Sequence, residues 1–301
     1  MVDFNNRKHI FVIAEAGSNW KCGRYDDDLK QAKQLIKIAS ECGADAVKFQ
    51  TYRSETTYVP QAGQSNYLSQ SGINKNINEI FNNLAMPYEM IPELAKYANQ
   101  ENIAFMSTSF SINDAKHIDP FVSIHKIASY EINHVRLLEF VAKTKKPIII
   151  STGASTYEEI DFAVNVVKKF HNNISLLQCT SRYPASLESL NLSVISKMKT
   201  RYNLPVGLSD HSIDPIIGPI LAIGLGATII EKHFTLDKNL PGPDHKFALN
   251  PLELKMMIQS IRSAQKTLGD GKKRVLNVEK ELREFAVRRI QARREIKKGE
   301  K

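Results

Sequence analysis

The chain has 301 residues, 42% hydrophobic and 24% charged, which allows one large domain or two ordinary ones with a sizeable core. No stretch approaches 18 apolar residues without a charge, and Glu15 interrupts the apolar run near the N-terminus, so neither a membrane span nor a signal peptide is predicted. The three cysteines, Cys22, Cys42 and Cys179, are too irregularly spaced for a disulfide framework or a zinc knuckle, and we expect a cytoplasmic protein with Cys179 in a strand core.

The formal net charge of +9 is concentrated at the C-terminus, where residues 283–301 contain eight Lys or Arg against three acids. A basic arm can bind nucleic acid. However, the rest of the chain is only mildly basic and carries no helix-turn-helix, zinc-finger or RNA-binding signature. We therefore expect no nucleic-acid partner, and an anionic substrate fits the remaining positive charge.

Short β-branched runs alternate with longer amphipathic stretches along the chain. The expected strands are IFVIAEAG (10–17), ADAVKFQTY (44–52), IAFMSTSF (103–110), VSIHKIASYE (122–131), PIIISTGAS (147–155), ISLLQCTSRYP (174–184), LPVGLSDH (204–211) and ATIIEKHFTL (227–236). Residues 26–43, 157–170 and 251–269 are typical of helices, and the first of them opens with three acids and closes on Gly43. Because alternating strands and helices imply parallel pairing, eight such units predict an α/β fold, the (β/α)8 TIM barrel.

Two segments interrupt this alternation. Residues 53–85 form a long polar connection, which in a barrel serves as a lid or binding loop on the catalytic face. The connection between the third and fourth strands has room only for a short helix. We expect the barrel to span residues 1–280 and a basic linker to span residues 281–301.

Each expected strand carries polar residues near its C-terminal end, the face on which barrel active sites are built. In chain order they are Glu15, Lys48, Thr108, Lys126, Ser129, Glu131, Ser151, Thr152, Ser181, Tyr183, Ser209, Asp210, His211, Glu231 and His233. A lysine inside a strand needs a partner or water, because burying its charge alone is costly, and this applies to Lys48, Lys126 and Lys232. The hydroxyl and ammonium groups of Thr108, Lys126, Ser129 and Ser151 suit a phosphate or a carboxylate.

His211 and His233 end adjacent expected strands. Two imidazoles there can chelate one divalent ion and leave positions for water and substrate. With Glu231 and Asp244 close by in the sequence, this pattern predicts Mn²⁺ or Mg²⁺ as the cofactor. Asp210 has two interpretations, since it could orient a histidine or simply begin the turn.

Nine motifs together resemble the sialic acid synthase family: IAEAGSN, GADAVKFQT, STSFS, KIASYE, PIIISTG, LLQCTSRYP, GLSDHS, EKHFTL and GPDHKFAL. The resemblance runs from about residue 10 to the C-terminus and includes all eight strands in order. It implies a (β/α)8 barrel that condenses phosphoenolpyruvate with an N-acetylated aldose such as N-acetylmannosamine. The products would be phosphate and a nine-carbon 2-keto sugar acid of the N-acetylneuraminate, legionaminate or pseudaminate type, and no covalent enzyme intermediate is required.

The resemblance also implies a role for each candidate residue. The ligands of phosphoenolpyruvate would be Lys48, Thr108, Lys126, Ser129, Ser151 and Ser209, with Ser181 as a further polar contact to substrate. His211 and His233 would bind the metal, and Glu231 would orient its water. Glu15 and Glu131 would be the acid–base and sugar-orienting carboxylates, and Tyr183 and Asp244 would contact the amino sugar.

The chain also departs from the family pattern. Asn19 and Trp20 stand where many members read Asn-His, and some members have Asn in place of Ser181. The sugar-contacting Asn of the second strand–helix loop could be Asn66, Asn74 or Asn76.

Members usually continue into a small antifreeze-like domain, which is swapped across a homodimer and supplies an Arg to the partner's sugar site. RRIQARREIKKGEK resembles the linker and first residues of that domain. We therefore expect a homodimer and a missing antifreeze-like domain, with either weaker sugar binding or a need for a separately encoded partner.

Two other functions stay open. In a class I aldolase, Lys48 or Lys126 would form a Schiff base with a carbonyl substrate. In a non-catalytic barrel, the same residues would bind sugar acids or a partner without turnover.

Overall fold

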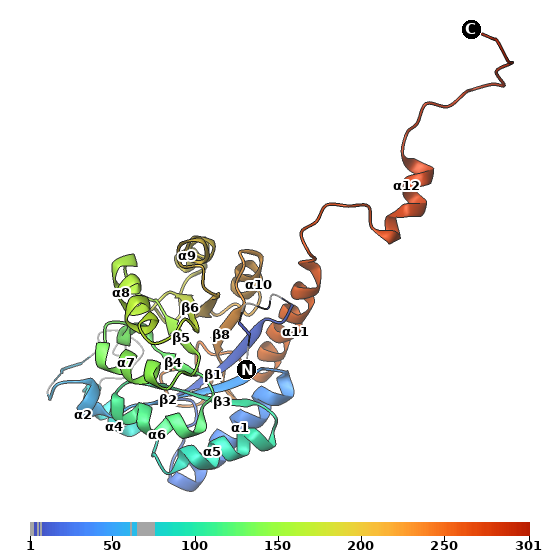
Figure 1. Cartoon of the computed structure of the whole chain (residues 1–301). Helices are drawn as coiled ribbons and strands as arrows, with labels where there is room; N and C mark the ends of the chain where they lie inside the picture. The colour runs from blue at the N-terminus through green and yellow to red at the C-terminus, as the bar shows by residue number, and fades with distance from the viewer. Residues whose placement is uncertain (1–2, 5, 7, 61, 65–75) are drawn as a thin grey trace. The chain divides into compact units, whose positions relative to one another are not determined.

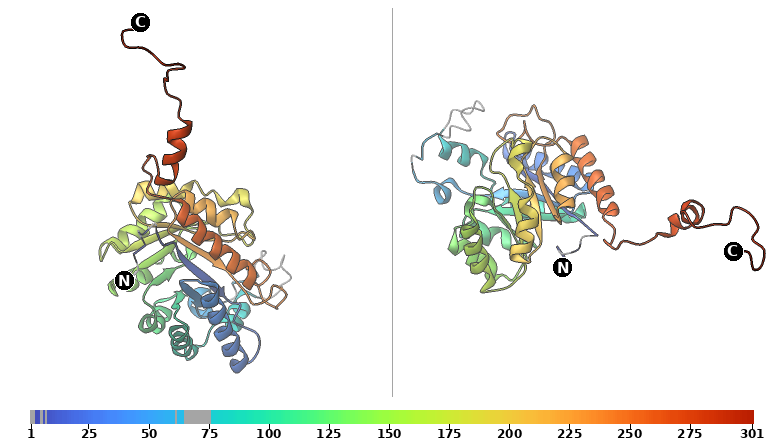
Figure 2. Two further views of the ribbon diagram at one scale, coloured as in Figure 1. Left: turned by 90° about the vertical axis from the view of Figure 1, so that its right-hand side faces the viewer. Right: turned by 90° about the horizontal axis from the view of Figure 1, so that it is seen from above.

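The computed structural model describes residues 3–4, 6, 8–60, 62–64 and 76–301. It divides into two compact units, Met1–Thr267 and Leu268–Lys301. The first unit is a closed barrel of parallel strands in the order β1 to β8, surrounded by helices (Figure 1, Figure 2). The α/β fold predicted from the sequence, a (β/α)8 barrel, is confirmed.

Each strand lies within the run expected for it, and each pairs in parallel with the next until β8 closes on β1. The bounds are β1 Phe11–Gly17, β2 Ala46–Thr51, β3 Ala104–Ser109, β4 His125–Ile127, β5 Ile148–Ser151, β6 Ile174–Cys179, β7 Val206–Asp210 and β8 Ile229–His233. Almost every strand residue is buried, because helices cover the outside of the barrel and inward-pointing side chains fill its interior.

The helices follow the strands in the expected alternation. They are α1 Tyr25–Cys42, α2 Ser54–Thr57, α4 Ile77–Leu84, α5 Met90–Gln100, α6 Ile112–Ile118, α7 Val135–Lys143, α8 Tyr157–Lys168, α9 Val194–Tyr202, α10 Ile217–Gly224 and α11 Pro251–Thr267. The first turn of α1 contains three Asp residues, whose negative charges interact favourably with the positive end of the helix dipole. The helix is capped at its C-terminal end by Gly43, whose φ of 88° is left-handed. Short 3-10 helices also occur at η1 Asp119–Phe121, η2 Ser129–Glu131 and η3 Leu187–Leu190.

An apolar floor fills the N-terminal half of the barrel. Its members include the strand residues Ile13, Ala46, Met106, Ile149, Leu177 and Ile229 and also Ile124, just before β4. Phe4 packs edge-on against Phe11 beneath them. The ring centroids of Phe4 and Phe11 are 5.2 Å apart. Gly207 of β7 belongs to the same layer, since a Cβ there would lie 2.7 Å from both Leu177 and Ile229. The floor leaves only the C-terminal end of the barrel open to a substrate.

The long connection between β2 and β3 carries α2 and α4. Asn76 caps α4 by accepting a hydrogen bond from the backbone N–H of Asn78, whereas Asn66 and Asn74 lie outside the described residues. The ring of Tyr52, just after β2, lies 4.6 Å from Phe81 of α4 and 5.3 Å from Phe110, just after β3. These aromatic contacts hold α4 beside the C-terminal face of the barrel.

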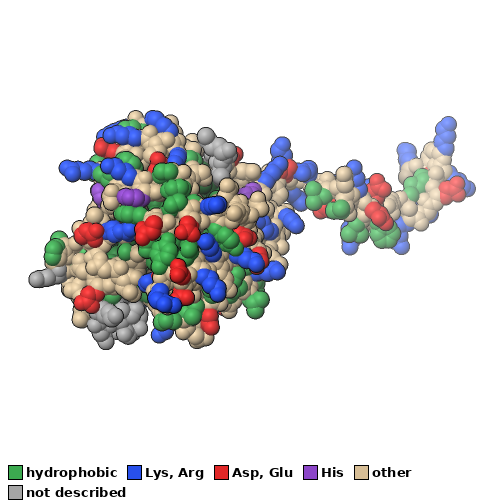
Figure 3. Space-filling view, turned by 90° about the horizontal axis from the view of Figure 1, so that it is seen from below, with side chains coloured by type: hydrophobic (Ala, Val, Ile, Leu, Met, Phe, Trp, Pro, Cys, Tyr) green, Lys and Arg blue, Asp and Glu red, His purple; other side chains and the backbone are tan. Residues whose placement is uncertain are grey.

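The second unit contains η4 Asn277–Glu279 and α12 Lys280–Ala286, and all its residues from Gly269 onward are exposed. The division predicted at residue 280 falls at the start of α12, within this second unit, which begins at Leu268. No helix in the described part of the chain is both long and apolar enough to cross a membrane. On the face of the barrel shown in Figure 3, Lys and Arg side chains are interspersed with Asp and Glu and form no single-sign patch.

Candidate active site

One ring of side chains lies directly above the apolar floor, two residues further along each strand. It consists of Glu15, Lys48, Thr108, Lys126, Ser151, Cys179, Ser209 and Glu231, and we call it the polar ring. Successive strand residues point to opposite faces, so a step of two returns to the barrel interior. The apolar floor and the polar ring are therefore two successive layers of inward-pointing side chains, as in other barrels of this type.

The polar ring and a second set of residues line a single cavity at the C-terminal ends of the strands. The second set is Gln50, Phe110, Ala128, Ser129, Tyr183, His211 and His233. The structure thus brings eleven of the predicted site residues together, namely Glu15, Lys48, Thr108, Lys126, Ser129, Ser151, Tyr183, Ser209, His211, Glu231 and His233. Glu131, Ser181 and Asp244 lie close to the cavity but do not line it.

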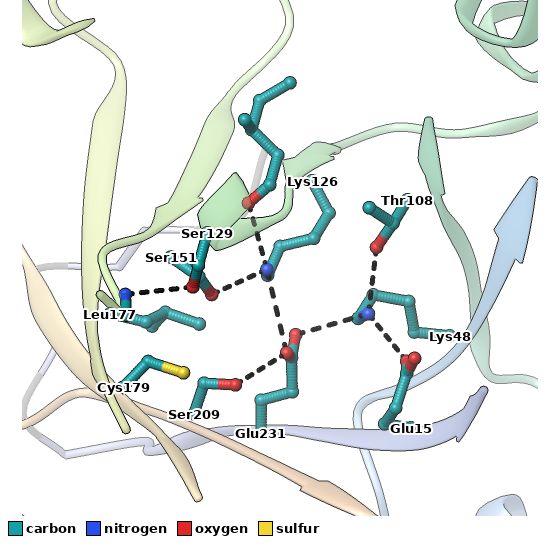
Figure 4. Close-up of polar contacts among 12 residues, drawn as sticks. Glu15, Lys48, Thr108, Lys126, Ser129, Ser151, Leu177, Cys179, Ser209 and Glu231 are labelled. Carbon is teal, nitrogen blue, oxygen red and sulfur yellow. Dashed lines mark hydrogen bonds and ion pairs between the residues drawn. The ribbon is translucent and has the colours of Figure 1, made fainter. Parts of the chain in front are cut away.

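Two buried lysines dominate the electrostatics of the polar ring (Figure 4). The Nζ of Lys48 lies 2.6 Å from Oε2 of Glu15 and donates to Oγ1 of Thr108 at 3.0 Å. The Nζ of Lys126 donates to Oγ of Ser151 at 2.7 Å. Glu231 lies between the two lysines, because each Nζ is 3.7 Å from one of its carboxylate oxygens. The expectation that strand lysines need partners is confirmed for both.

This environment separates the pKa values of the two ring carboxylates. Burial raises the pKa of Glu15 to about 7, although Lys48 opposes the shift. Burial also acts on Glu231, but the attraction of Lys126 and Lys48 outweighs it and lowers the pKa of Glu231 below its ordinary value. Near neutral pH Glu231 is therefore ionised, while Glu15 can gain or lose a proton.

Hydroxyl groups gather beside Lys126. Ser129 accepts a hydrogen bond at 2.9 Å from the backbone N–H of Gly153, just after β5. A Cβ at Gly153 would lie 3.0 Å from both Ser129 Oγ and Cys179 Sγ and would collide with Ser181 Oγ. Glycine at this position therefore allows the side chains of Ser129, Ser181 and the strand residue Cys179 to approach one another.

His211 and His233 follow each other around the rim, with ring centroids 5.7 Å apart. The Nδ1 of His211 lies 2.7 Å from the carbonyl oxygen of Thr180, an arrangement that assigns the proton to Nδ1 and leaves a lone pair on Nε2. Burial lowers the pKa of His233 well below its usual range, so this imidazole is neutral, and its buried Nδ1 has no hydrogen-bond partner among the described residues. Burial would lower the pKa of His211 as well, but Cys179 and the carbonyl of Thr180 outweigh burial and raise it, so a metal ion there would compete with a proton. In their neutral forms the two imidazoles offer lone pairs that fit a divalent metal ion.

The two histidines would have to hold such an ion with few other protein ligands. Within the described ranges, no group of three or more His, Cys, Asp or Glu side chains is arranged to bind a metal. The remaining coordination positions would therefore be open to water and substrate, as in catalytic metal sites. The ring of Tyr183 packs 4.0 Å from the ring of His211 and 5.7 Å from that of His233, and so borders the same space.

Two predicted carboxylates lie at the edge of the cavity. Glu131 ends η2, and burial raises its pKa to about 7, while its Oε2 has no partner in the described part of the chain. Asp244 accepts hydrogen bonds from the backbone N–H of Ser18 at 3.2 Å and from its hydroxyl at 2.9 Å. Gly17, whose φ is +52°, leaves room for Asp244 and His233 to meet above β1.

Four cavity residues were not among the predicted site residues, namely Gln50, Phe110, Ala128 and Cys179, and two of them carry polar or ionisable groups. Gln50 donates to Oε1 of Glu15 at 2.9 Å, and its position two residues after Lys48 could have identified it. Cys179 belongs to the polar ring and not only to the strand core, and its Sγ lies 3.8 Å from Nδ1 of His211. Because all residues of β6 are buried, the sequence of this strand does not indicate which side chains point into the barrel, and the inward direction of Cys179 was not predicted.

Asp210 could orient a histidine or simply begin the turn. Its carboxylate bonds to Lys232 at 2.6 Å and to the backbone N–H of Ser212 at 2.8 Å. Asp210 therefore supports the turn after β7 and makes no hydrogen bond to the imidazole of His211.

Comparison with known proteins identifies the family of the chain. The sequence pattern described as the NeuB family matches residues 35–273. The chain belongs to the NeuB family. The resemblance of its motifs to sialic acid synthases is thereby confirmed.

Several relatives of this NeuB-family chain have been named. It is 40% identical to an N,N'-diacetyllegionaminic acid synthase of Legionella pneumophila, over 96% of this chain and 82% of the relative. It is 36% identical to a pseudaminic acid synthase of Campylobacter jejuni, over 99% of this chain and 86% of that one. A crystal structure of N-acetylneuraminic acid synthetase from Leptospira borgpetersenii, in complex with citrate, superposes with a TM-score of 0.81 at 34% identity, covering 93% of this chain and 92% of that chain.

Proposed function

We propose that the chain condenses phosphoenolpyruvate with an N-acetylated six-carbon aldose, and releases phosphate and a nine-carbon 2-keto sugar acid. The observation that carries the proposal is the polar ring, in which two buried lysines flank the carboxylate of Glu231 at the closed end of the cavity. Phosphoenolpyruvate carries two anionic groups, a carboxylate and a phosphate. Each can pair with one lysine and the hydroxyls beside it.

The hydroxyls divide into two sets around these lysines. Thr108 lies beside Lys48, whereas Ser151 lies beside Lys126 with Ser129 and Ser181 nearby. Ser209 donates to Glu231 at 3.0 Å and can turn to an anion instead. Binding would thus replace internal bonds of the ring with bonds to the substrate, and would exclude water from the barrel interior.

The carboxylates suit the charges that develop in the reaction. C3 of phosphoenolpyruvate attacks the aldehyde carbon of the open-chain sugar, and positive charge develops at C2. The ionised carboxylate of Glu231 stabilises that charge. Water then adds to C2, and the C–O bond to phosphate breaks. With pKa values of about 7, Glu15 and Glu131 can supply a proton to the sugar oxygen and remove one from the water.

His211 and His233 would hold a divalent ion, Mn²⁺ or Mg²⁺, which when bound would polarise the aldehyde as a Lewis acid. Tyr183 lines the cavity and Asp244 lies close to it, and both would contact the amino sugar. The motif GPDHKFAL, together with the legionaminic relative, favours an N-acetylated or N,N'-diacetylated aldose of the neuraminate or legionaminate type.

A phosphate-release assay tests this function. Phosphoenolpyruvate and Mn²⁺ are supplied with a panel of N-acetylated and N,N'-diacetylated aldoses, and release should require both substrates. EDTA and the His211→Ala variant should each abolish it. Release that survives both treatments would contradict the proposal, and no release with any sugar would favour the non-catalytic barrel.

One observation favours a second function, that of a class I aldolase. Burial lowers the pKa of Lys126, and a lysine that is neutral more often is a better amine nucleophile. Borohydride reduction in the presence of pyruvate should then label the unaltered chain and not Lys126→Met. The synthase proposal predicts no labelling of either chain.

A further inference from the structure

A buried ion pair lies behind the two rim histidines. Glu231 and His233 of β8 line the cavity, so the intervening Lys232 points outward to the helix layer. Asp210 of β7 is its register neighbour, and the two side chains are joined by an Nζ–Oδ2 distance of 2.6 Å. The two residues are only 2% and 1% exposed.

The ammonium of Lys232 has three acceptors for its three N–H donors. Besides Asp210, it donates to the carbonyl oxygen of Ser212 at 2.6 Å and to its hydroxyl at 3.2 Å. Asp210 in turn accepts from the backbone N–H of Ser212 at 2.8 Å. The residues on both sides of His211 are therefore tied to the residue that precedes His233. We call Asp210, Ser212 and Lys232 the rim clamp.

Helix α10 seals the rim clamp from solvent. A Cβ at Gly218 would lie 2.8 Å from Oδ2 of Asp210, so only glycine allows this approach. Burying two charges costs nearly as much as their attraction returns, and a pair of apolar side chains would pack at least as well. An apolar pair could not, however, hydrogen-bond to the backbone of Ser212. The rim clamp therefore contributes a fixed geometry more than it contributes stability.

We propose that Lys232 and Asp210 are positioning residues that fix His211 relative to His233 and so set the affinity of the site for a divalent ion. The proposal rests on the metal role given to these histidines in the proposed function. The hydrogen bond from His211 to Thr180 fixes the rotation of one ring. The rim clamp fixes the spacing of the two strand ends that carry the pair.

The test is the Mn²⁺ affinity of the double variant Asp210→Asn, Lys232→Met, measured by calorimetric titration of the full chain. The variant leaves no buried charge unpaired, and its Asn oxygen can still accept from Ser212. Loss of a group that orients a metal ligand weakens binding about 10- to 100-fold, and we expect a change of that size. The matched control is Asp119→Asn, Lys146→Met, which removes a 2.8 Å ion pair at the other end of the barrel and should leave Mn²⁺ affinity unchanged.

Folding of each variant is followed by the fluorescence of Trp20, the single tryptophan. If the double variant does not fold, Lys232→Gln keeps a neutral donor and should weaken Mn²⁺ binding at least about threefold. Unchanged affinity in a folded rim-clamp variant would overturn this proposal and leave the metal role standing. Absence of Mn²⁺ binding by the unaltered chain would overturn both.

Discussion

At the scale of single residues, Glu131 makes the stability of the fold depend on pH. Its pKa rises from an ordinary value of 4.5 to about 7, mainly through burial. The folded state therefore holds this proton more tightly than the unfolded state does, and unfolding free energy is lost as pH rises from 4.5 to 7. Because Gln cannot ionise, Glu131→Gln should be more stable than the unaltered chain at pH 8, by up to about 3 kcal/mol.

Urea unfolding monitored by Trp20, which is 1% exposed, measures this difference. At pH 4.5 the advantage of Glu131→Gln should nearly vanish, since the folded state is neutral in both chains. The exposed Glu55→Gln is the matched control and should show no comparable gain. An equal advantage at both pH values would show that packing, and not ionisation, is responsible.

A substitution at Gly153 should change substrate binding much more than it changes the stability of the fold. Its φ lies outside the left-handed region, so alanine is compatible with the backbone, but the new Cβ would displace the hydroxyls of Ser181 and Ser129. Serine hydroxyls rotate at little cost, so we expect Gly153→Ala to change the unfolding free energy by less than about 1 kcal/mol. It should raise KM for phosphoenolpyruvate about tenfold or more, because a lost hydrogen bond to a charged group is worth about 1.5–3 kcal/mol.

Steady-state phosphate release at saturating sugar measures that KM. The double variant Gly153→Ala, Ser181→Ala removes the nearest clashing oxygen, and it should recover part of the affinity if crowding is the cause. An unchanged KM in Gly153→Ala would remove these hydroxyls from the anion site.

The direction of single side chains was the least predictable part of the site. Strands of a parallel barrel are buried on both faces, so their sequences show no alternation that would tell inside from outside. Lys48, Lys126 and Lys232 looked equivalent for this reason, yet the first two line the cavity and the third faces the helices. Cys179 was missed for the same reason.

At the scale of elements, the N-terminus of α8 offers a direct test of capping. Thr156 accepts from the backbone N–H of Glu159, and the Glu159 side chain accepts in return from the N–H of Thr156. This reciprocal pair satisfies two donors that the helix leaves open, so Thr156→Ala should lower the unfolding free energy by about 1 kcal/mol. Ser193 occupies the same N-cap position on α9 but makes no capping hydrogen bond with its side chain. Ser193→Ala should therefore change the unfolding free energy by less than about 0.5 kcal/mol. Equal losses in the two urea-unfolding experiments would contradict this account.

Element order was predictable from the sequence because β-branched runs and amphipathic segments alternate with little ambiguity. Element ends were less predictable. The fourth expected run, residues 122–131, yields only the strand His125–Ile127, because the chain turns into η2 at Ser129. That early turn brings Ser129 into the lining of the cavity and Glu131 to its edge, so a local irregularity positions two of the predicted site residues.

At the scale of the whole molecule, the two units should differ sharply in protease resistance. Residues 269–301 are all exposed, whereas the apolar floor, the polar ring and Trp20 all belong to the unit Met1–Thr267. Trypsin should therefore cut first at exposed basic residues such as Lys272, Lys273 and Arg274, since cleavage requires an unfolded, accessible backbone.

The trimmed barrel should keep the urea midpoint of the intact chain, because no side chain that leaves with the second unit contributes to the core. Trp20 fluorescence reports the barrel alone in both samples, so the two midpoints are directly comparable. A midpoint that fell on trimming would mean that the exposed apolar residues of the second unit, among them Val278, Leu282 and Phe285, stabilise the barrel in solution. In that case the barrel would not be an independent folding unit. Size-exclusion chromatography before and after trypsin would then test whether the second unit acts through the predicted homodimer.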